Sequence, residues 1–225
     1  MSNTGKLSIV ATPIGNLEDI TLRALRTLKE ADAIYAEDTR ITAKLLAKYD
    51  IKKPVFRLDE AKEMIKAKEV IERLEKGEKI AYVSDAGTPG ISDPGARLVK
   101  AARTAGFQAV TIPGSSALTA ALSIAGLATP EFMFMGFLPH KKGRQTALKH
   151  ISREKRTLVL YESPHRILKL MGEFDSIIPE RQITLARELT KVHEEILKGT
   201  PAELWARLET DGSARGEFVV IVEPA

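Results

Sequence analysis

The chain has 225 residues, of which 44% are hydrophobic and 28% are charged, and its formal net charge is +4 at pH 7. This composition can bury a core, so disorder is not the default expectation, and the length allows one large domain or two compact ones. The lack of cysteine excludes disulfides, thiolate metal sites and a cysteine nucleophile, and the N-terminal apolar run is too short for a signal peptide or membrane span, so we expect a cytoplasmic protein that does not contact membranes.

Strands and helices alternate in the predicted first half of the chain. Five short apolar runs are typical of strands, at residues 7–11, 33–37, 54–58, 79–84 and 107–112. Helical spacing follows the first three runs, at Leu22, Leu25 and Leu28, at Ile41, Leu45 and Tyr49, and at Met64, Ala67, Ile71 and Leu74. We expect a fourth helix to begin at Asp93-Pro94, because aspartate can accept from free amides and proline suits the first helical position. The alternation predicts a parallel sheet with both faces covered.

The second half follows a different pattern, in which strands are less regularly separated by helices. Strands are predicted at residues 132–138, 157–161, 183–186, 194–197 and 217–222, and helices at 117–126, 143–154, 164–174 and 201–209. This half requires its own mixed sheet. We therefore expect a two-lobed α/β fold, with a parallel-sheet N-terminal lobe at residues 1–114 and a mixed-sheet C-terminal lobe at 115–225 that begins with a connecting helix.

Three turn-rich loops follow strands of the first predicted sheet. They read TPIGN after the first strand, SDAGTPGISDPG after the fourth and PGSS after the fifth. The carboxyl ends of parallel strands form the binding edge of such sheets, so these loops predict a ligand site, although plain turns would explain any one of them. Neither the P-loop pattern nor the dinucleotide fingerprint is present. The residues alone therefore indicate a small polar ligand, a class that includes nucleoside-like compounds. Backbone amides and Asp85 would hold this ligand.

Positive charge is concentrated between Pro139 and Arg156. This segment has seven cations and one anion, a local excess of 7 − 1 = +6. Such an excess is typical of a surface that binds a polyanion, while a solvated helix face is the alternative. The candidate RNA-binding residues are Lys141, Lys142, Arg144, Lys149 and Arg153.

Eight motifs occur in order along nearly the whole chain: ATPIGNLEDIT, AEDTR, VSDAGTPGISDPG, PGSSALTAAL, GFLP, YESPHR, ARELTKVHEE and GEFVVIVE. Together they resemble the tetrapyrrole-methylase-like (class III) superfamily, and in particular its branch that methylates small-subunit ribosomal RNA. The resemblance implies two lobes, S-adenosylmethionine as cofactor in the cleft between them, and a homodimer. It implies as substrate the ribose 2′-oxygen of cytidine 1402 in the 16S RNA of the small ribosomal subunit.

The resemblance also implies site residues. The cofactor would contact residues of both lobes, namely Pro13, Ser84, Asp85, Ala86, Gly87, Thr88, Ser115, Ser116, Ala117, Tyr161, Ala186 and Arg187. A ribose hydroxyl is a poor nucleophile, so a base or a cation should assist it. The candidates are Glu37, Asp38, Arg40, Glu162, His165, Arg187 and Glu188. No His, Asp and Glu cluster has the spacing of metal ligands, so no metal is expected.

Several of these candidates also have structural interpretations. Asp38 would cap a helix that begins at Thr39, and Ser163-Pro164 is a good helix start beside Glu162 and His165. Arg187 and Glu188 would pair across the junction of the two lobes.

Two departures from the family pattern concern RNA recognition and not the cofactor. Residues 58–61 stand where the family carries a stretch with His and Asn, and typical members continue beyond the last motif, whereas this sequence stops at Ala225. Two other functions remain as alternatives: methylation of a tetrapyrrole or another small molecule, and a non-catalytic RNA-binding assembly factor.

Overall fold

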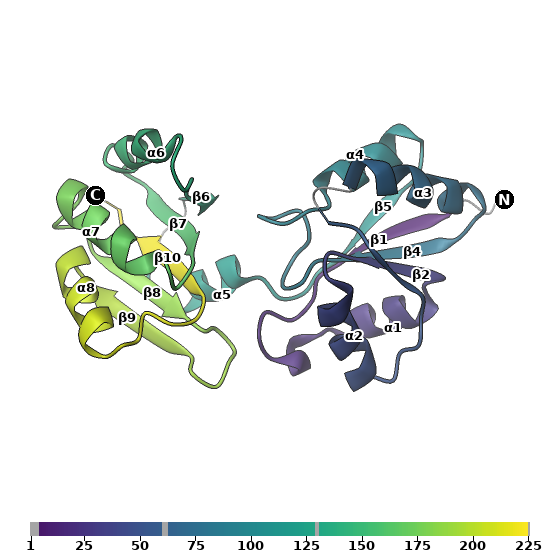
Figure 1. The fold of residues 1–225 in the computed structure, drawn as a ribbon, viewed down its shortest axis with the longest axis horizontal. Helices are drawn as coiled ribbons and strands as arrows, with labels where there is room; N and C mark the ends of the chain where they lie inside the picture. The colour runs from purple at the N-terminus through teal and green to yellow at the C-terminus, as the bar shows by residue number, and fades with distance from the viewer. Residues whose placement is uncertain (1–4, 60–62, 129–130, 225) are drawn as a thin grey trace. The chain divides into compact units, whose positions relative to one another are not determined.

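A computed structural model describes residues 5–59, 63–128 and 131–224 of the chain. The chain divides into two compact units, unit 1 at Met1–Ser116 and unit 2 at Ala117–Ala225 (Figure 1). Glu60 and Ala61, which belong to the stretch that departs from the family pattern, lie outside the described residues. Within the described part, no helix is both long and apolar enough to span a membrane.

Unit 1 is built on a five-stranded parallel sheet in the order β3-β2-β4-β1-β5. Its elements in chain order are β1 (Lys6–Val10), a short 3-10 turn (Leu17–Asp19), α1 (Leu22–Glu30), β2 (Ala33–Ala36), α2 (Thr39–Lys48), β3 (Val55–Arg57), α3 (Glu63–Glu75), β4 (Lys79–Val83), α4 (Ala96–Thr104) and β5 (Ala109–Ile112).

Helices cover both faces of this sheet, as expected for parallel strands. Leu28 of α1 and Leu46 of α2 share a core with Val10 and Val83. Leu74 of α3 and Leu98 and Ala102 of α4 share the other core with Tyr35 and Tyr82. Figure 1 shows α1 and α2 on one side of the sheet and α3 and α4 on the other. Successive side chains of each strand therefore enter different cores.

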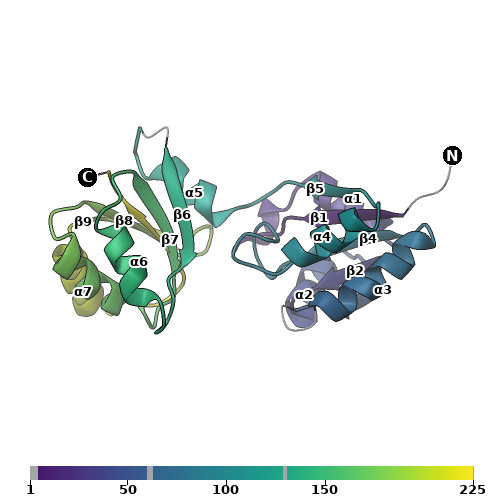
Figure 2. The same cartoon turned by 90° about the horizontal axis from the view of Figure 1, so that it is seen from above.

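Unit 2 has a mixed sheet in the order β6-β7-β10-β8-β9, in which only β6 and β7 are parallel. Its elements are α5 (Ala117–Ile124), β6 (Phe132–Phe137), α6 (Arg144–Ile151), β7 (Thr157–Glu162), α7 (Ile167–Ile177), β8 (Ile183–Arg187), β9 (Glu195–Gly199), α8 (Pro201–Thr210) and β10 (Phe218–Val222). Helices α6, α7 and α8 bury one core against this sheet, and Figure 2 shows α6 and α7 beside β7 and β8.

The predicted α/β class and all ten predicted strands are confirmed, with every strand end within two residues of the expected position. Two predicted helix starts are wrong. Helix α4 begins at Ala96 and not at Asp93-Pro94, and α7 begins at Ile167 and not at Ser163-Pro164. The carbonyl of Ser163 instead accepts from the amides of Arg166 and Ile167, so the Ser-Pro pair forms a turn before the helix.

Glu63 provides the cap that Asp93 was expected to give. Its Oε1 atom accepts hydrogen bonds from the amides of Gly95 (3.0 Å), Arg97 (2.9 Å) and Leu98 (3.0 Å) at the start of α4. Gly95 has φ +126°, and a Cβ there would lie 2.8 Å from the ring of Tyr82, so only glycine fits. The loop SDAGTPGISDPG is therefore anchored at its end by a carboxylate from α3.

This cap also changes the register expected for α3. Glu63, Ala67, Val70 and Leu74 form the buried face, whereas Met64 is 62% exposed. Apolar spacing could not reveal this face, because its first position is a charged residue. Glu63 can be buried because three amides satisfy its carboxylate.

We predict that Glu63→Ala lowers the free energy of unfolding of the protein by about 3 kcal/mol, because it leaves buried amides without acceptors. Glu63→Gln keeps an acceptor oxygen and loses only the charge at the helix N-terminus, so its loss should be about 1 kcal/mol. Glu72→Ala, on an exposed position of the same helix, is the control. Chemical denaturation measures all three, and equal stability of Glu63→Ala and Glu72→Ala would contradict the cap.

Candidate functional site

The carboxyl ends of the strands of unit 1 are joined by backbone pairing. Thr12, after β1, forms an isolated antiparallel bridge with Gly87, after β4. The amide of each donates to the carbonyl of the other, at 2.9 and 3.0 Å. The hydroxyl of Thr88 donates to the carbonyl of Ser115, after β5, at 3.3 Å. The structure thus brings together the three loops that the sequence singled out.

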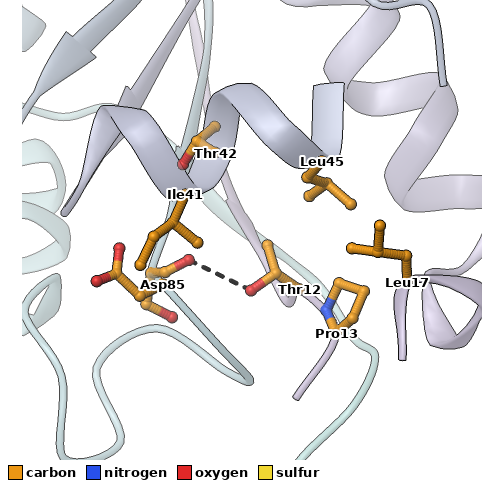
Figure 3. A pocket seen from close by; sticks show the side chains of 8 residues that line it. Thr12, Pro13, Leu17, Ile41, Thr42, Leu45 and Asp85 are labelled. Atoms are coloured by element: carbon orange, nitrogen blue, oxygen red, sulfur yellow. Dashed lines mark hydrogen bonds between the residues drawn. The ribbon is translucent and has the colours of Figure 1, made fainter. Parts of the chain in front are cut away.

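A pocket lies beside this bridge, between the first loop, helix α2 and the end of β4 (Figure 3). The lining residues are Thr12, Pro13, Leu17, Ile41, Thr42, Leu45, Ser84 and Asp85. Most of its wall is apolar, while Asp85 places a carboxylate at one side. Ile41 lines it and is 42% exposed, so this residue does not belong to the core stripe expected for α2. Such a lining suits a ligand with an apolar face and a cationic or hydroxyl group.

Asp85 connects the ends of β2 and β4. Its Oδ1 atom accepts a hydrogen bond of 2.9 Å from the amide of Asp38. Burial raises the pKa of the Asp85 carboxyl, while the Asp38 amide opposes this shift. Asp85 is therefore held in place as an acceptor at the pocket wall, in surroundings that disfavour its negative charge.

Two further carboxylates share this environment. Burial raises the pKa of Glu37, with Asp85 and Asp93 adding to the shift by repulsion. Burial also raises the pKa of Asp93 to about 6, where the Ser84 hydroxyl opposes the shift and Asp85 adds to it. A positive charge bound here would relieve this repulsion. The carboxyl edge of unit 1 is thus suited to a cationic ligand.

Asp38 and Arg40 form a different local arrangement. Asp38 is the N-cap of α2 and accepts from the Arg40 amide at 2.8 Å, which confirms its predicted capping role. The Arg40 guanidinium, with its Nη2 atom 2.5 Å from Asp38 Oδ2, holds the pKa of this carboxyl well below its usual range. Asp38 is therefore a weak base at neutral pH.

Two glycines allow the loops to approach each other closely. A Cβ at Gly114 would lie 3.1 Å from the Cβ of Ala11, and Gly87 has φ +74° beside Ile14. Neither position accepts a larger side chain without strain. This explains why the loop motifs contain glycine at these points.

In unit 2, the predicted cofactor contacts Tyr161 and Ala186 share one sheet face, because both pair with Val219 of β10. Tyr161 packs edge-on against Phe134, at a ring distance of 5.0 Å, and against Phe137 at 5.6 Å. Their assignment as cofactor contacts stays a prediction, as does the predicted cleft between the lobes.

The candidates Glu162 and Arg187 occupy the opposite face of this sheet, since both pair with Phe218 of the helix-covered core. Glu162 is 1% exposed and accepts from the Ser163 amide at 2.8 Å. Arg187 donates to the Ser213 carbonyl at 2.7 Å and lies 3.6 Å from Glu195. Both side chains therefore have structural partners inside unit 2.

Glu188 also has partners within unit 2. Its Oε1 atom accepts from Lys191 Nζ at 2.7 Å and from the Glu217 amide at 2.9 Å. This side chain folds back over Gly216, where a Cβ would lie 2.4 Å from Glu188 Cγ. Arg187 and Glu188 thus have partners within unit 2, and their pairing across the junction of the lobes stays a prediction. His165 is exposed in the turn before α7.

The basic segment contains one residue that does not fit the expected role. Lys141, Lys142, Lys149 and Arg153 are exposed. Arg144 is only 4% exposed and forms a two-pronged ion pair with Glu173, so direct RNA contact by Arg144 does not agree with its burial. No group of three or more possible metal ligands is found within the described residues.

Sequence reasoning missed part of the site. Thr12, Leu17, Ile41, Thr42 and Leu45 line the pocket, yet their spacing predicts only turns and a helix face. The one feature of the sequence that could have indicated the pocket is the polar residue Thr42, which lies among apolar residues of α2. The close approach of the first loop to α2 depends on tertiary packing, which periodicity does not specify.

Comparisons with known proteins agree with this architecture. A family model described as Tetrapyrrole (Corrin/Porphyrin) Methylases matches residues 6–204. A Thermotoga maritima protein named ribosomal RNA small subunit methyltransferase I is 46% identical over 218 residues, which cover 97% of this chain and 98% of that protein. A Haemophilus influenzae protein of the same name is 50% identical over 224 residues, with coverage of 98% and 79%. A solved Thermus thermophilus uroporphyrin-III C-methyltransferase, complexed with S-adenosyl homocysteine, has a TM-score of 0.67 at 19% identity and 97% coverage of each chain. That last likeness shows the fold alone.

The raised pKa of Asp93 predicts a pH-dependent stability. Because the folded-state pKa of about 6 exceeds the ordinary value of about 4, the folded state binds this proton more tightly. The contribution to stability is present below pH about 4 and is lost as the pH rises through about 6. Asp93→Asn removes this loss because asparagine does not ionise. At pH 7.5 the unfolding free energy of the variant should therefore exceed that of wild type by about 1 to 2 kcal/mol, after allowance for solvent screening. At pH 4 the two unfolding free energies should match.

Chemical denaturation across this pH range measures the difference. The control is Asp175→Asn, which removes one negative charge from an exposed position of α7. A difference between Asp93→Asn and wild type that does not change with pH would contradict the assigned environment of Asp93.

Proposed function

The chain belongs to the tetrapyrrole (corrin/porphyrin) methylase family, and we propose that it uses S-adenosylmethionine to methylate the ribose 2′-oxygen of cytidine 1402 in the 16S RNA of the small ribosomal subunit. The observation that carries this proposal is the similarity, over nearly the whole of this chain, to two bacterial proteins named ribosomal RNA small subunit methyltransferase I. The nucleotide and the oxygen follow the activity that the family resemblance implies.

The residues at the carboxyl edge of unit 1 fit this cofactor. S-adenosylmethionine supplies a methyl group on a positively charged sulfur, which makes the methyl carbon electrophilic. Glu37, Asp85 and Asp93 have pKa values raised mainly by burial, and a nearby positive charge would stabilise their ionised forms. The apolar wall beside Asp85 provides surface for the uncharged parts of the cofactor. Pro13, residues 84–88 and residues 115–117 are proposed to hold it.

Glu37 is the better candidate for a base than its neighbour Asp38. A general base works best when its pKa approaches the working pH. The pKa of Glu37 is raised by burial, whereas Arg40 holds the pKa of Asp38 very low. We therefore assign Glu37 the role of accepting the ribose proton and Asp38 the role of capping α2 and orienting Asp85 through its amide. Methyl transfer requires the ribose oxygen, the methyl carbon and the sulfur to lie nearly in line. Holding them in this arrangement would supply much of the rate enhancement.

The small-molecule alternative has weaker support. Solved tetrapyrrole methyltransferases share the fold at under 25% identity, and fold alone does not specify a substrate. The exposed lysines of unit 2 favour a polyanionic substrate such as RNA. As the resemblance implies, we also propose that the protein acts as a homodimer in the cytoplasm.

The direct test offers labelled S-adenosylmethionine and unmethylated small ribosomal subunits to the full-length protein. We expect label in the 16S RNA, at the 2′-oxygen of cytidine 1402, as located by nuclease digestion and mass spectrometry. Assembled subunits are offered and not bare RNA, so that the assay includes a target nucleotide presented only on the assembled surface. Tight binding of subunits without transfer would instead indicate the non-catalytic assembly factor, and transfer to a tetrapyrrole but not to RNA would indicate the small-molecule enzyme.

A further inference from the structure

The loop from Leu138 to Gly143, here called the lysine loop, connects β6 to α6 and presents Lys141 and Lys142 to solvent. Three more exposed cations follow, at Lys149, Arg153 and Lys155. None of these five has an ion pair within the described part of the chain, unlike Arg144 and Arg156. Because α6 alone is eight residues long, or about 12 Å, these charges extend beyond the size of a single phosphate. They fit a polyanion.

Arg144 holds the lysine loop from one side. Its Nε and Nη2 atoms donate to the Glu173 carboxylate of α7, at 2.9 and 2.5 Å. Its Nη1 atom donates to the Pro139 carbonyl at 3.1 Å. One guanidinium therefore joins a helix of the core to the backbone of the loop, with 4% of its surface exposed.

Arg166 holds the adjacent residue of the loop. Its Nη2 atom donates to the Leu138 carbonyl at 2.5 Å, and its Nη1 atom lies 3.3 Å from His140 Nε2. Its Nε atom lies 3.3 Å from Glu162 Oε1, and the Glu162 side chain is fully buried. The two arginines thus bind neighbouring carbonyls, and each is fixed by a carboxylate on another element.

Stability alone does not explain this pair of contacts. A buried ion pair is weak evidence for stability, because its desolvation offsets most of its attraction, and apolar side chains could fill the same space. What apolar side chains cannot do is hold two carbonyls of a loop in one orientation. Gly143, with φ +87°, then turns the chain into α6 without a side-chain cap. The conformation of the lysine loop is therefore defined before any ligand binds.

We propose that Arg144 and Arg166 are positioning residues that hold the lysine loop so that Lys141 and Lys142 bind phosphates of the substrate RNA, an inference that rests on the proposed function. A flexible loop loses conformational entropy when it is ordered on binding, and a preformed loop avoids this loss. Arg144 itself does not contact RNA. Its effect on RNA affinity passes entirely through the two lysines.

A double-mutant cycle tests this dependence, with small ribosomal subunits as the ligand and binding measured by filter retention over a range of salt concentrations. Lys141→Gln with Lys142→Gln should weaken binding about tenfold and reduce the slope of log affinity against log salt by about 1.4, for two phosphate contacts. Arg144→Lys keeps the charge but cannot make the two-pronged contact, so it should weaken binding about threefold. Combining all three changes should be no worse than the lysine pair alone.

The pair Lys149→Gln with Arg153→Gln, one residue on α6 and one just after it, is the matched control, and its effect should multiply with that of Arg144→Lys. The inference is overturned if the effects of Arg144→Lys and the Lys141 and Lys142 changes also multiply, or if the lysine changes leave affinity and salt slope unaltered. If Arg144→Lys lowers the melting temperature so far that the variant is not folded under the assay conditions, Arg166→Lys replaces it in the same double-mutant cycle. The same two outcomes then support or overturn the inference.

The proposed function is tested separately, by measuring methyl transfer with the same protein preparations. Wild type that binds subunits but transfers no methyl group contradicts the proposed function, while the cycle still decides the role of the arginines. Wild type that binds S-adenosylmethionine but not subunits overturns the role of the lysine loop and leaves the methyltransferase chemistry intact.

Discussion

The bridge between Thr12 and Gly87 is the interaction on which the candidate site depends. Parallel strands end at one edge, but their loops are free to diverge unless something joins them. Here two backbone hydrogen bonds connect the loop after β1 to the loop after β4, and the Asp38 amide connects β2 to Asp85. Glu63 fixes the far end of the same loop at the start of α4. Backbone groups thereby position a carboxylate beside an apolar pocket.

The two units carry side chains of opposite charge at their candidate binding residues. In unit 1, burial raises the pKa values of Glu37, Asp85 and Asp93, so a bound cation would stabilise their ionised forms. In unit 2, exposed lysines stand next to arginines that are paired with carboxylates, Arg144 with Glu173 and Arg166 with the buried Glu162. Under the proposed function, the cationic methyl donor meets the carboxylates of unit 1 and the polyanionic RNA meets the exposed lysines of unit 2. Lys141 and Lys142 have no ion pair among the residues that the structure describes, whereas the arginines that hold their loop are paired.

The sequence predicted the regular parts of the fold well, because strand runs and the alternation of strand and helix are local patterns. It also located the three loops and the cap at Asp38, since glycine, proline and capping residues act over a few positions. It failed where a polar side chain reaches a distant element. Glu63 caps α4 across 32 residues, and Arg144 pairs with Glu173 across 29. Neither residue differs in type from its solvated neighbours, so local spacing gives no sign that it is buried.

The central claim is that the carboxylates of unit 1 receive the positive sulfur of the cofactor. Titration calorimetry at pH 6, in two buffers with different heats of ionisation, tests it most directly. Binding of S-adenosylmethionine should release protons, because a positive charge lowers the raised pKa values of Glu37, Asp85 and Asp93. S-adenosylhomocysteine lacks the charge on sulfur and should release fewer, and Asp85→Asn should reduce the difference between the two ligands. Equal proton release by both ligands with the wild-type protein would contradict the account.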